Sequence, residues 1–165
     1  MIRNKPLAQV IRAATLLMFA LGGQAVFAQQ KLELFSKVEA AFKQREPGWK
    51  VEKINQLAPY HESITFRKGN RQASVEVLKW DSPTHAHETF DGLVIAFDNV
   101  HEKHAVKTML ANFGDENYMW TSLGNYNWPT IYMREGSVVV MLFAPSIPVA
   151  KRFAQHVLEQ IDNQP

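Results

Sequence analysis

Residues 138–143 constrain the fold more than any other segment, because the run Val-Val-Val-Met-Leu-Phe is apolar at every position. Successive side chains of a strand point to opposite faces of a sheet, so an unbroken apolar run requires cover on both faces. The turn-forming pair Glu135-Gly136 separates this run from the strand-like residues 131–134. The sequence therefore predicts a hairpin over 131–143 whose second strand is central in a covered sheet.

A second hairpin is expected earlier in the chain. Residues 63–67 and 73–77 alternate apolar and polar side chains, and Lys68-Gly69-Asn70 between them favours a tight turn. The segment 49–54, which contains Trp49 and Val51, indicates a further strand. These strands have one apolar and one polar face, as is typical of antiparallel sheets.

Three segments repeat apolar residues at helical spacing. The first helix is expected over 31–45 and ends at Glu46-Pro47-Gly48. The second starts at Ser82-Pro83, with Ser82 as N-cap and Pro83 in the first turn, and ends within 98–104. The third follows Ser146. Each apolar stripe must lie against a core.

The order of elements is therefore α-β-β-β-α-(β)-β-β-α, in which the bracketed strand stands for 105–113, a segment that suits a strand or a helix. Hairpins dominate, so the sheet is mainly antiparallel. We expect an α+β domain with about five to six strands and helices on both faces of the sheet.

The N-terminus has the three parts of a secretory signal peptide. Arg3, Lys5 and Arg12 precede the apolar run 13–21, and Val26-Phe27-Ala28 supplies small residues for cleavage. The run is shorter than the roughly 20 residues that span a bilayer. We expect residues 1–28 to be a signal peptide cut after Ala28 and 29–165 to be one periplasmic or secreted domain; an uncleaved anchor is the alternative.

Removal of that segment changes the charge of the chain. The sequence has 18 Lys and Arg against 16 Asp and Glu, and three of the basic residues lie in the signal, which leaves 15 against 16. A near-neutral domain lacks the basic footprint of proteins that bind nucleic acid or anionic membranes. Cysteine is absent, which excludes disulfides, thiol catalysis and thiolate metal sites.

The C-terminal third carries a family resemblance. The segments Gly114-Asp115-Glu116-Asn117-Tyr118 and Arg134-Glu135-Gly136-Ser137, followed by an Ala-containing helix, resemble small exported bacterial domains with a GDEAY turn and an R-x-G-N hairpin. The architecture of those domains is similar to the PsbP/Mog1-like α/β/α sandwich. Here Asn117 replaces Ala and Ser137 replaces Asn. The resemblance implies this fold and export, and it implies no activity.

The segment 117–132 is rich in aromatic and amide side chains, and most of it is expected to be loop with short strands. Aromatic residues on irregular backbone are enriched at binding surfaces. A loop folded over a sheet edge with half-buried rings is the alternative. The candidate ligand-binding residues are Tyr118, Trp120, Tyr126, Trp128 and Tyr132.

Histidines suggest a second kind of site. The spacing D-x-x-H-x-x-H of Asp98, His101 and His104 suits one face of a helix and predicts a candidate metal site if the helix continues that far. His85 and His87 lie in the first turns of the second helix, where residues two apart diverge. Solvated helix-end histidines without metal are the alternative.

Catalytic motifs are missing from the sequence. It contains no G-x-S-x-G, S-x-x-K or P-loop pattern, and the pair Asp115-Glu116 is expected to form a turn. We therefore expect a non-catalytic exported domain, monomeric or weakly dimeric and without a cofactor, that binds a partner protein or small ligand through 117–132. A metal-binding periplasmic protein and a small hydrolase are the alternatives.

Overall fold

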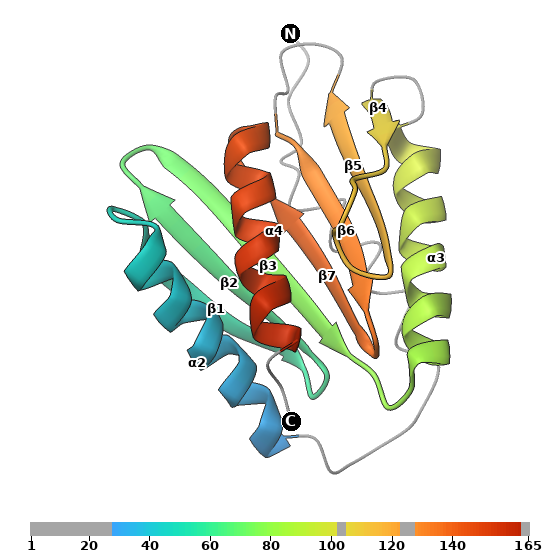
Figure 1. The fold of residues 1–165 in the computed structure, drawn as a ribbon, viewed down its shortest axis with the longest axis horizontal. Helices are drawn as coiled ribbons and strands as arrows, with labels where there is room; N and C mark the ends of the chain where they lie inside the picture. Colours follow the sequence, from blue (N-terminus) through green and yellow to red (C-terminus); the bar gives the residue numbers. More distant parts are fainter. Residues whose placement is uncertain (1–27, 102–104, 123–127, 163–165) are drawn as a thin grey trace, which may run out of the picture.

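The computed structural model describes residues 28–101, 105–122 and 128–162 (Figure 1). Its elements alternate as α-β-β-β-α-β-β-β-β-α. In chain order they are α2 (Ala28–Arg45), β1 (Lys50–Ala58), β2 (His61–Lys68), β3 (Arg71–Lys79), α3 (Pro83–His101), β4 (Ala105–Thr108), β5 (Glu116–Ser122), β6 (Thr130–Glu135), β7 (Val138–Phe143) and α4 (Ile147–Asp162). The residues of the expected signal peptide up to 27 lie outside the described part.

The strands form one antiparallel sheet in the order β1-β2-β3-β7-β6-β5-β4. The expected α+β class with a mainly antiparallel sheet is confirmed. Strand β7 is the middle strand, and all six of its residues are buried. The prediction of a central strand covered on both faces is therefore confirmed.

The expected number of strands, five to six, was too low by at least one, because the sheet has seven. The segment 105–113 contains the short strand β4. The segment 117–129, expected to be mostly loop, contains β5, which pairs with β6 from Glu116↔Arg134 to Trp120↔Thr130. Both faces of β5 are covered, so it lacks the alternation that marks a half-exposed strand.

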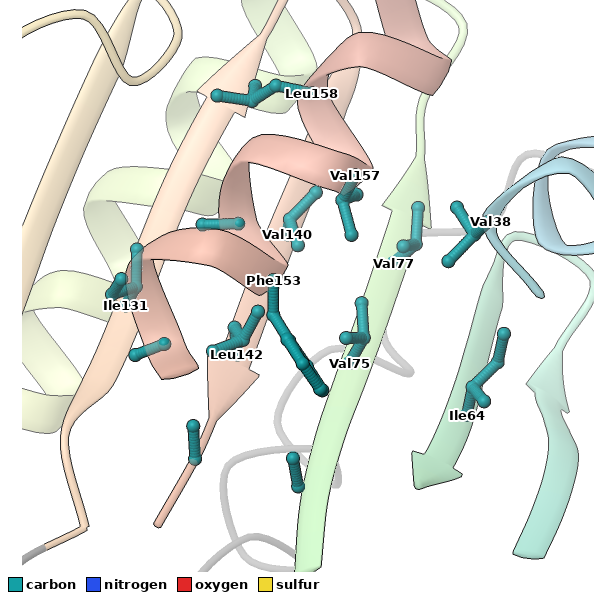
Figure 2. Packing of buried hydrophobic residues seen from close by; sticks show 14 of the residues in the cluster. Val38, Ile64, Val75, Val77, Ile131, Val140, Leu142, Phe153, Val157 and Leu158 are labelled. Atoms are coloured by element: carbon teal, nitrogen blue, oxygen red, sulfur yellow. The ribbon is translucent and has the colours of Figure 1, made fainter. Parts of the chain in front are cut away.

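Helices α2 and α4 lie side by side on one face of the sheet, in front of it in Figure 1. Their apolar stripes pack on inward residues of β2, β3, β6 and β7 (Figure 2). The rings of Phe42, Phe66 and Phe153 form the centre of this core, with centroids 4.3 to 5.7 Å apart. Stacked and edge-to-face rings at such distances stabilise a core beyond their buried area.

The buried residue Glu46 joins α2 to α4. Its carboxylate accepts hydrogen bonds from Arg152 Nε at 2.8 Å and lies 3.3 Å from His156 Nε2. Burial alone would raise the pKa of Glu46, but the hydrogen bonds and charges of Arg152 and His156 outweigh it and lower this pKa. The two helices are therefore connected by an ionic contact as well as by apolar packing.

Helix α3 covers part of the opposite face and forms a second core with β3, β5, β6 and β7. The backbone N–H of His85 donates to Ser82 Oγ at 3.3 Å, which confirms Ser82 as the N-cap. The buried residues of the stripe are Ala86, Phe90, Leu93 and Val94. No helix of the described residues is long and apolar enough to cross a membrane.

Candidate functional site

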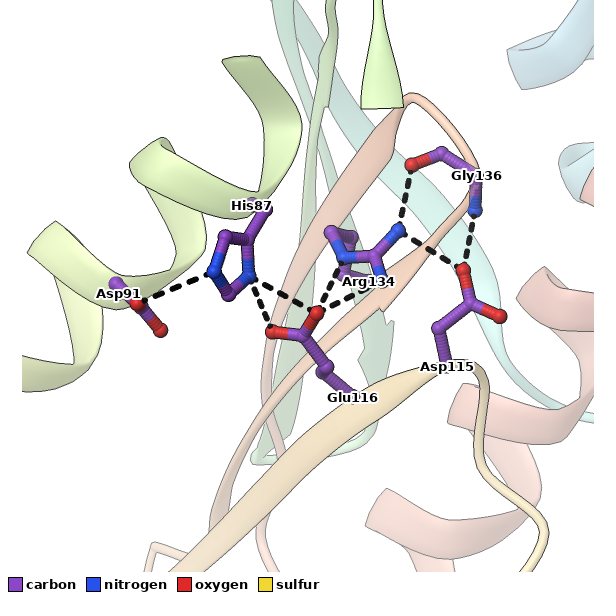
Figure 3. Close-up of polar contacts among 6 residues, drawn as sticks. All are labelled: His87, Asp91, Asp115, Glu116, Arg134 and Gly136. Carbon is purple, nitrogen blue, oxygen red and sulfur yellow. Dashed lines mark hydrogen bonds and ion pairs between the residues drawn. The ribbon is translucent and has the colours of Figure 1, made fainter. Parts of the chain in front are cut away.

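A cluster of polar side chains lies where the N-terminal half of α3 passes the first residue of β5 and the end of β6 (Figure 3). His87 and Asp91 come from α3, one helical turn apart, and Glu116 begins β5. Arg134 of β6 is the cross-strand partner of Glu116. Three separate elements thus meet at this cluster, and each is fixed by the second core.

Arg134 organises the strand side of the cluster. Its Nε and Nη2 atoms donate to Oε1 of Glu116 at 3.0 and 2.7 Å. Its Nη1 atom donates to Asp115 Oδ2 and to the Gly136 carbonyl, both at 2.8 Å. Arg134 therefore fixes Oε1 of Glu116 in place, and both oxygens of this carboxylate lie within 3.0 Å of His87 Nδ1 on α3.

His87 lies between the two carboxylates on the helix side. Its Nδ1 atom is 2.9 Å from Glu116 Oε2, and its Nε2 atom is 3.5 Å from Asp91 Oδ2. His85, two residues earlier, pairs instead with Asp81 through Nδ1 at 2.6 Å. The two histidines therefore face different partners, in agreement with the expected divergence on a helix.

The cluster is strongly ionic. Burial alone would raise the pKa of Glu116, but hydrogen bonds and charges from Arg134 and His87 outweigh it and lower this pKa. Nearby, burial together with the charges of Asp115 and Asp162 raises the pKa of Glu135. Chemically, the arrangement presents ionised carboxylates and an imidazole, which are ligands for cations.

The aromatic residues predicted from the sequence are divided between core and surface. Trp120 and Tyr132 are 3% and 6% exposed and pack against Phe97 of α3, and Tyr118 stacks on Phe90. Trp128, by contrast, is 46% exposed. Tyr126 lies outside the described residues. The expectation of mostly irregular backbone is wrong for Tyr118 and Trp120, because they belong to β5. Tyr132 belongs to β6, in the hairpin predicted over 131–143.

The predicted metal ligands of 98–104 are only partly described. Asp98 Oδ1 accepts a hydrogen bond from Trp120 Nε1 at 2.7 Å, and its Oδ2 accepts one from Lys107 Nζ at 2.6 Å. The ring of His101 lies 4.3 Å from that of Phe97. His104 falls outside the described residues. The Asp98 carboxylate therefore connects the end of α3 to β4 and β5.

Exposed apolar side chains are a further candidate for a binding surface. Five of the eight large apolar residues exposed in the described part of the chain lie on α3, on β4 and its flank, or just before β6. They are Ile95, Val100, Val106, Met109 and Trp128. We call Val106 and Met109, which lie in β4 and directly after it, the β4-edge surface, because β4 is the last strand on that side of the sheet.

The sequence did not predict that His87, Asp91 and Glu116 form one cluster. One local signal was present, since His87 and Asp91 have the i, i+4 spacing that places two side chains on one helix face. Their contact with Glu116, 29 residues after His87 in the sequence, depends on which strands α3 crosses. No local pattern contains that information.

Comparison with known proteins supports the fold. No family model and no curated protein matches the chain. Among solved structures, it is similar to the extracellular domain of PknH from Mycobacterium tuberculosis, with a TM-score of 0.53 and 12% identity over 87% of this chain and 100% of that chain. At that identity the likeness shows the fold alone. The resemblance to PsbP/Mog1-like sandwiches stays a prediction.

Proposed function

We propose that this chain is an exported, non-catalytic domain that binds an extended segment of a partner protein at the β4-edge surface. Export is supported by the signal-like residues 1–28 and by a likeness to a domain that is itself extracellular. The observation that carries the binding proposal is the presence of exposed apolar side chains on and beside β4, which is the last strand of the sheet in the described part of the chain.

Both edge strands carry exposed apolar residues, which are Ile54 and Leu57 on β1 and Val106 on β4. The two edges differ in the regularity of their pairing, and this favours β4. The edge strand β1 has register irregularities at 51–53 and 56–58 and carries Lys50 and Lys53; bulges and lysines are the usual protection against edge-to-edge pairing. Strand β4 pairs with β5 in regular register. Val106 and Met109, in and beside β4, are 45% and 68% exposed.

Edge addition is the binding mode that matches these features. An extended peptide would add main-chain hydrogen bonds along β4, while Val106 and Met109 supply apolar contacts. The charge of Lys107 on this strand is already paired with Asp98 at 2.6 Å. A partner segment with apolar rather than acidic side chains therefore fits this edge.

The binding proposal is tested by capture of partners from the extracytoplasmic fraction of the producing cell with wild type, Val106→Lys and Ile54→Lys. Ile54 is the matched control, since it is an exposed apolar residue on the opposite edge strand. We expect a specific partner to be lost with Val106→Lys and kept with Ile54→Lys. Equal capture of partners by all three proteins would contradict the proposal. A concentration-dependent dimer that Val106→Lys abolishes would also contradict it, because a second copy of this chain would then occupy the edge.

Export has its own test. The intact mass of the protein recovered from outside the cytoplasm should correspond to a chain that begins at Gln29. A chain that keeps Met1 and stays in the cytoplasm would exclude export.

A further inference from the structure

We propose that His87, Asp91 and Glu116 form a binding site for one divalent transition-metal ion of the Zn²⁺ type. The three residues each offer one ligand atom, and these atoms all lie within 4.8 Å of one another. This site is independent of the β4-edge surface and lies beside the first half of α3 rather than beside β4 (Figure 3).

The ligand types and their spacing suit such an ion. An imidazole nitrogen and two carboxylate oxygens are common zinc ligands, with metal–ligand distances of about 2.0–2.2 Å. Two ligands of one tetrahedral ion are then about 3.4 Å apart, and the three candidate atoms, one from each residue, lie within 4.8 Å of one another. His87 can give the ion only one of its two ring nitrogens. The side chains of His87 and Asp91 are about half exposed, so they have room to rotate until one His87 nitrogen and both carboxylates surround one ion.

The supporting contacts also match those of a metal site. Ligating carboxylates in proteins are held by hydrogen bonds from a surrounding shell of residues. Arg134 donates twice to Oε1 of Glu116, and both oxygens of this carboxylate lie within 3.0 Å of His87 Nδ1. Arg134 is itself held by Asp115 and by the Gly136 carbonyl. The site therefore stands on a helix and two paired strands, which position ligands better than loops do.

The charge balance favours a divalent cation. Asp91, Glu116 and Asp115 contribute three negative charges, and Arg134 contributes one positive charge. With His87 neutral, as a ligand must be, two negative charges remain for the ion to neutralise. Three protein ligands leave at least one coordination position for water or for a donor from another molecule.

The test is isothermal titration calorimetry with Zn²⁺, and with Mg²⁺ as comparison, on protein purified without a polyhistidine tag. We expect one Zn²⁺ per chain and binding at least tenfold tighter than that of Mg²⁺, since Mg²⁺ prefers an all-oxygen shell. His87→Gln should weaken Zn²⁺ binding more than tenfold, and Glu116→Gln should weaken it similarly. Circular dichroism spectra should match the wild type for His87→Gln, because that side chain is exposed.

His85→Gln is the matched control, since His85 lies on the same helix and also pairs with a carboxylate. It should bind Zn²⁺ as tightly as the wild type. Absence of Zn²⁺ binding, or equal binding by His87→Gln, would overturn the proposal. Loss of binding with Asp98→Asn but not with His87→Gln would place the ion at the other end of α3 and would also overturn it.

Discussion

Gly114 occupies a position where the backbone leaves no room for a side chain. Its φ is +72°, and a Cβ built on it would lie 2.5 Å from the carbonyl oxygen of Arg134. That oxygen also accepts the hydrogen bond of the Asp115 N–H at 2.9 Å, so it cannot easily move. The turn that presents Asp115 and Glu116 thus depends on a glycine.

We expect Gly114→Ala to lower the free energy of unfolding by more than about 3 kcal/mol, from the left-handed backbone and the contact with Arg134 together. Gly136→Ala is the control: its φ is +54°, but nothing lies within 4 Å of the added Cβ. It should cost only about 1–2 kcal/mol. Urea denaturation measures both, and equal losses would show that the close approach is unimportant.

Phe153 lies at the centre of the first core. It is fully buried and its ring contacts those of Phe42, Trp49 and Phe66. We expect Phe153→Ala to cost about 3–5 kcal/mol, because the cavity opens between α4 and the sheet. Ile147→Ala in the first turn of the same helix should change stability by less than about 0.5 kcal/mol, since Ile147 is 40% exposed. A similar loss for both variants in urea denaturation would contradict this assignment.

At the scale of elements, the position of α3 on β5 and β6 decides which strand residues meet His87 and Asp91 and which meet Asp98. Near its N-terminus α3 contributes His87 and Asp91, and near its C-terminus Asp98 accepts from Trp120 Nε1. The ring of Phe97 also lies 4.7 Å from that of Trp120. Trp120 is thus a core residue of this contact, although the sequence indicated a ligand-binding role.

We expect Trp120→Ala to cost about 3–5 kcal/mol and Trp128→Ala less than about 0.5 kcal/mol, as measured by thermal unfolding. The reason is burial, since Trp120 is 3% exposed and Trp128 46%. If Trp120→Ala left stability unchanged, α3 would not depend on this ring for its position. Only Trp128 of this pair is suited to contact a partner.

Local sequence patterns predicted the helices and strands that have one apolar and one polar face, or that end at turn-forming residues. The hairpins β2–β3 and β6–β7 and the three helices were predicted in this way. Strand β5 was not, because Tyr118 and Trp120 pack on α3 while Asn117 on the other face binds the backbone of Leu110 and Phe113. Its aromatic residues suit a strand, but the segment lacks the alternation that would have marked one in the sequence.

The candidate sites show the same limit. Asp98 and His101 were found by helical spacing, but the contacts of Asp98 with Trp120 and Lys107 come from the sheet. His87 and Asp91 needed Glu116 from a distant strand before they formed a cluster. Spacing within an element can be read from a sequence, whereas the pairing of elements that completes a site cannot.

Across the whole molecule, ionised carboxylates connect separate elements, and Glu46 and Glu116 are two of them. Glu46 joins α2 to α4 on one face of the sheet, and Glu116 joins β5 to α3 on the other. Both have a pKa lowered from the ordinary value of 4.5. A lowered folded-state pKa contributes stability that is present above the unfolded-state pKa and is lost as the pH falls through the folded-state pKa.

Glu135 has the opposite effect on how stability changes with pH. Its pKa is raised above 4.5 by burial and by the charges of Asp115 and Asp162. The folded chain therefore takes up this proton more readily than the unfolded chain, and protonation of Glu135 stabilises the fold as the pH falls toward 4.5. Replacement by Gln removes an unfavourable charge at neutral pH and removes this gain on acidification.

We therefore expect the free energy of unfolding, measured by urea denaturation between pH 7 and pH 3, to decline as the pH falls below about 4.5. The double variant Glu46→Gln/Glu116→Gln should be less stable than the wild type at pH 7. Its free energy of unfolding should decline less steeply than that of the wild type below about pH 4.5. Glu135→Gln should be more stable than the wild type at pH 7 and should approach it as the pH falls to 4.5. If the double variant lost as much stability on acidification as the wild type, other carboxylates would control the acid response. The contacts of Glu46 and Glu116 would then be unimportant for holding these helices and strands together.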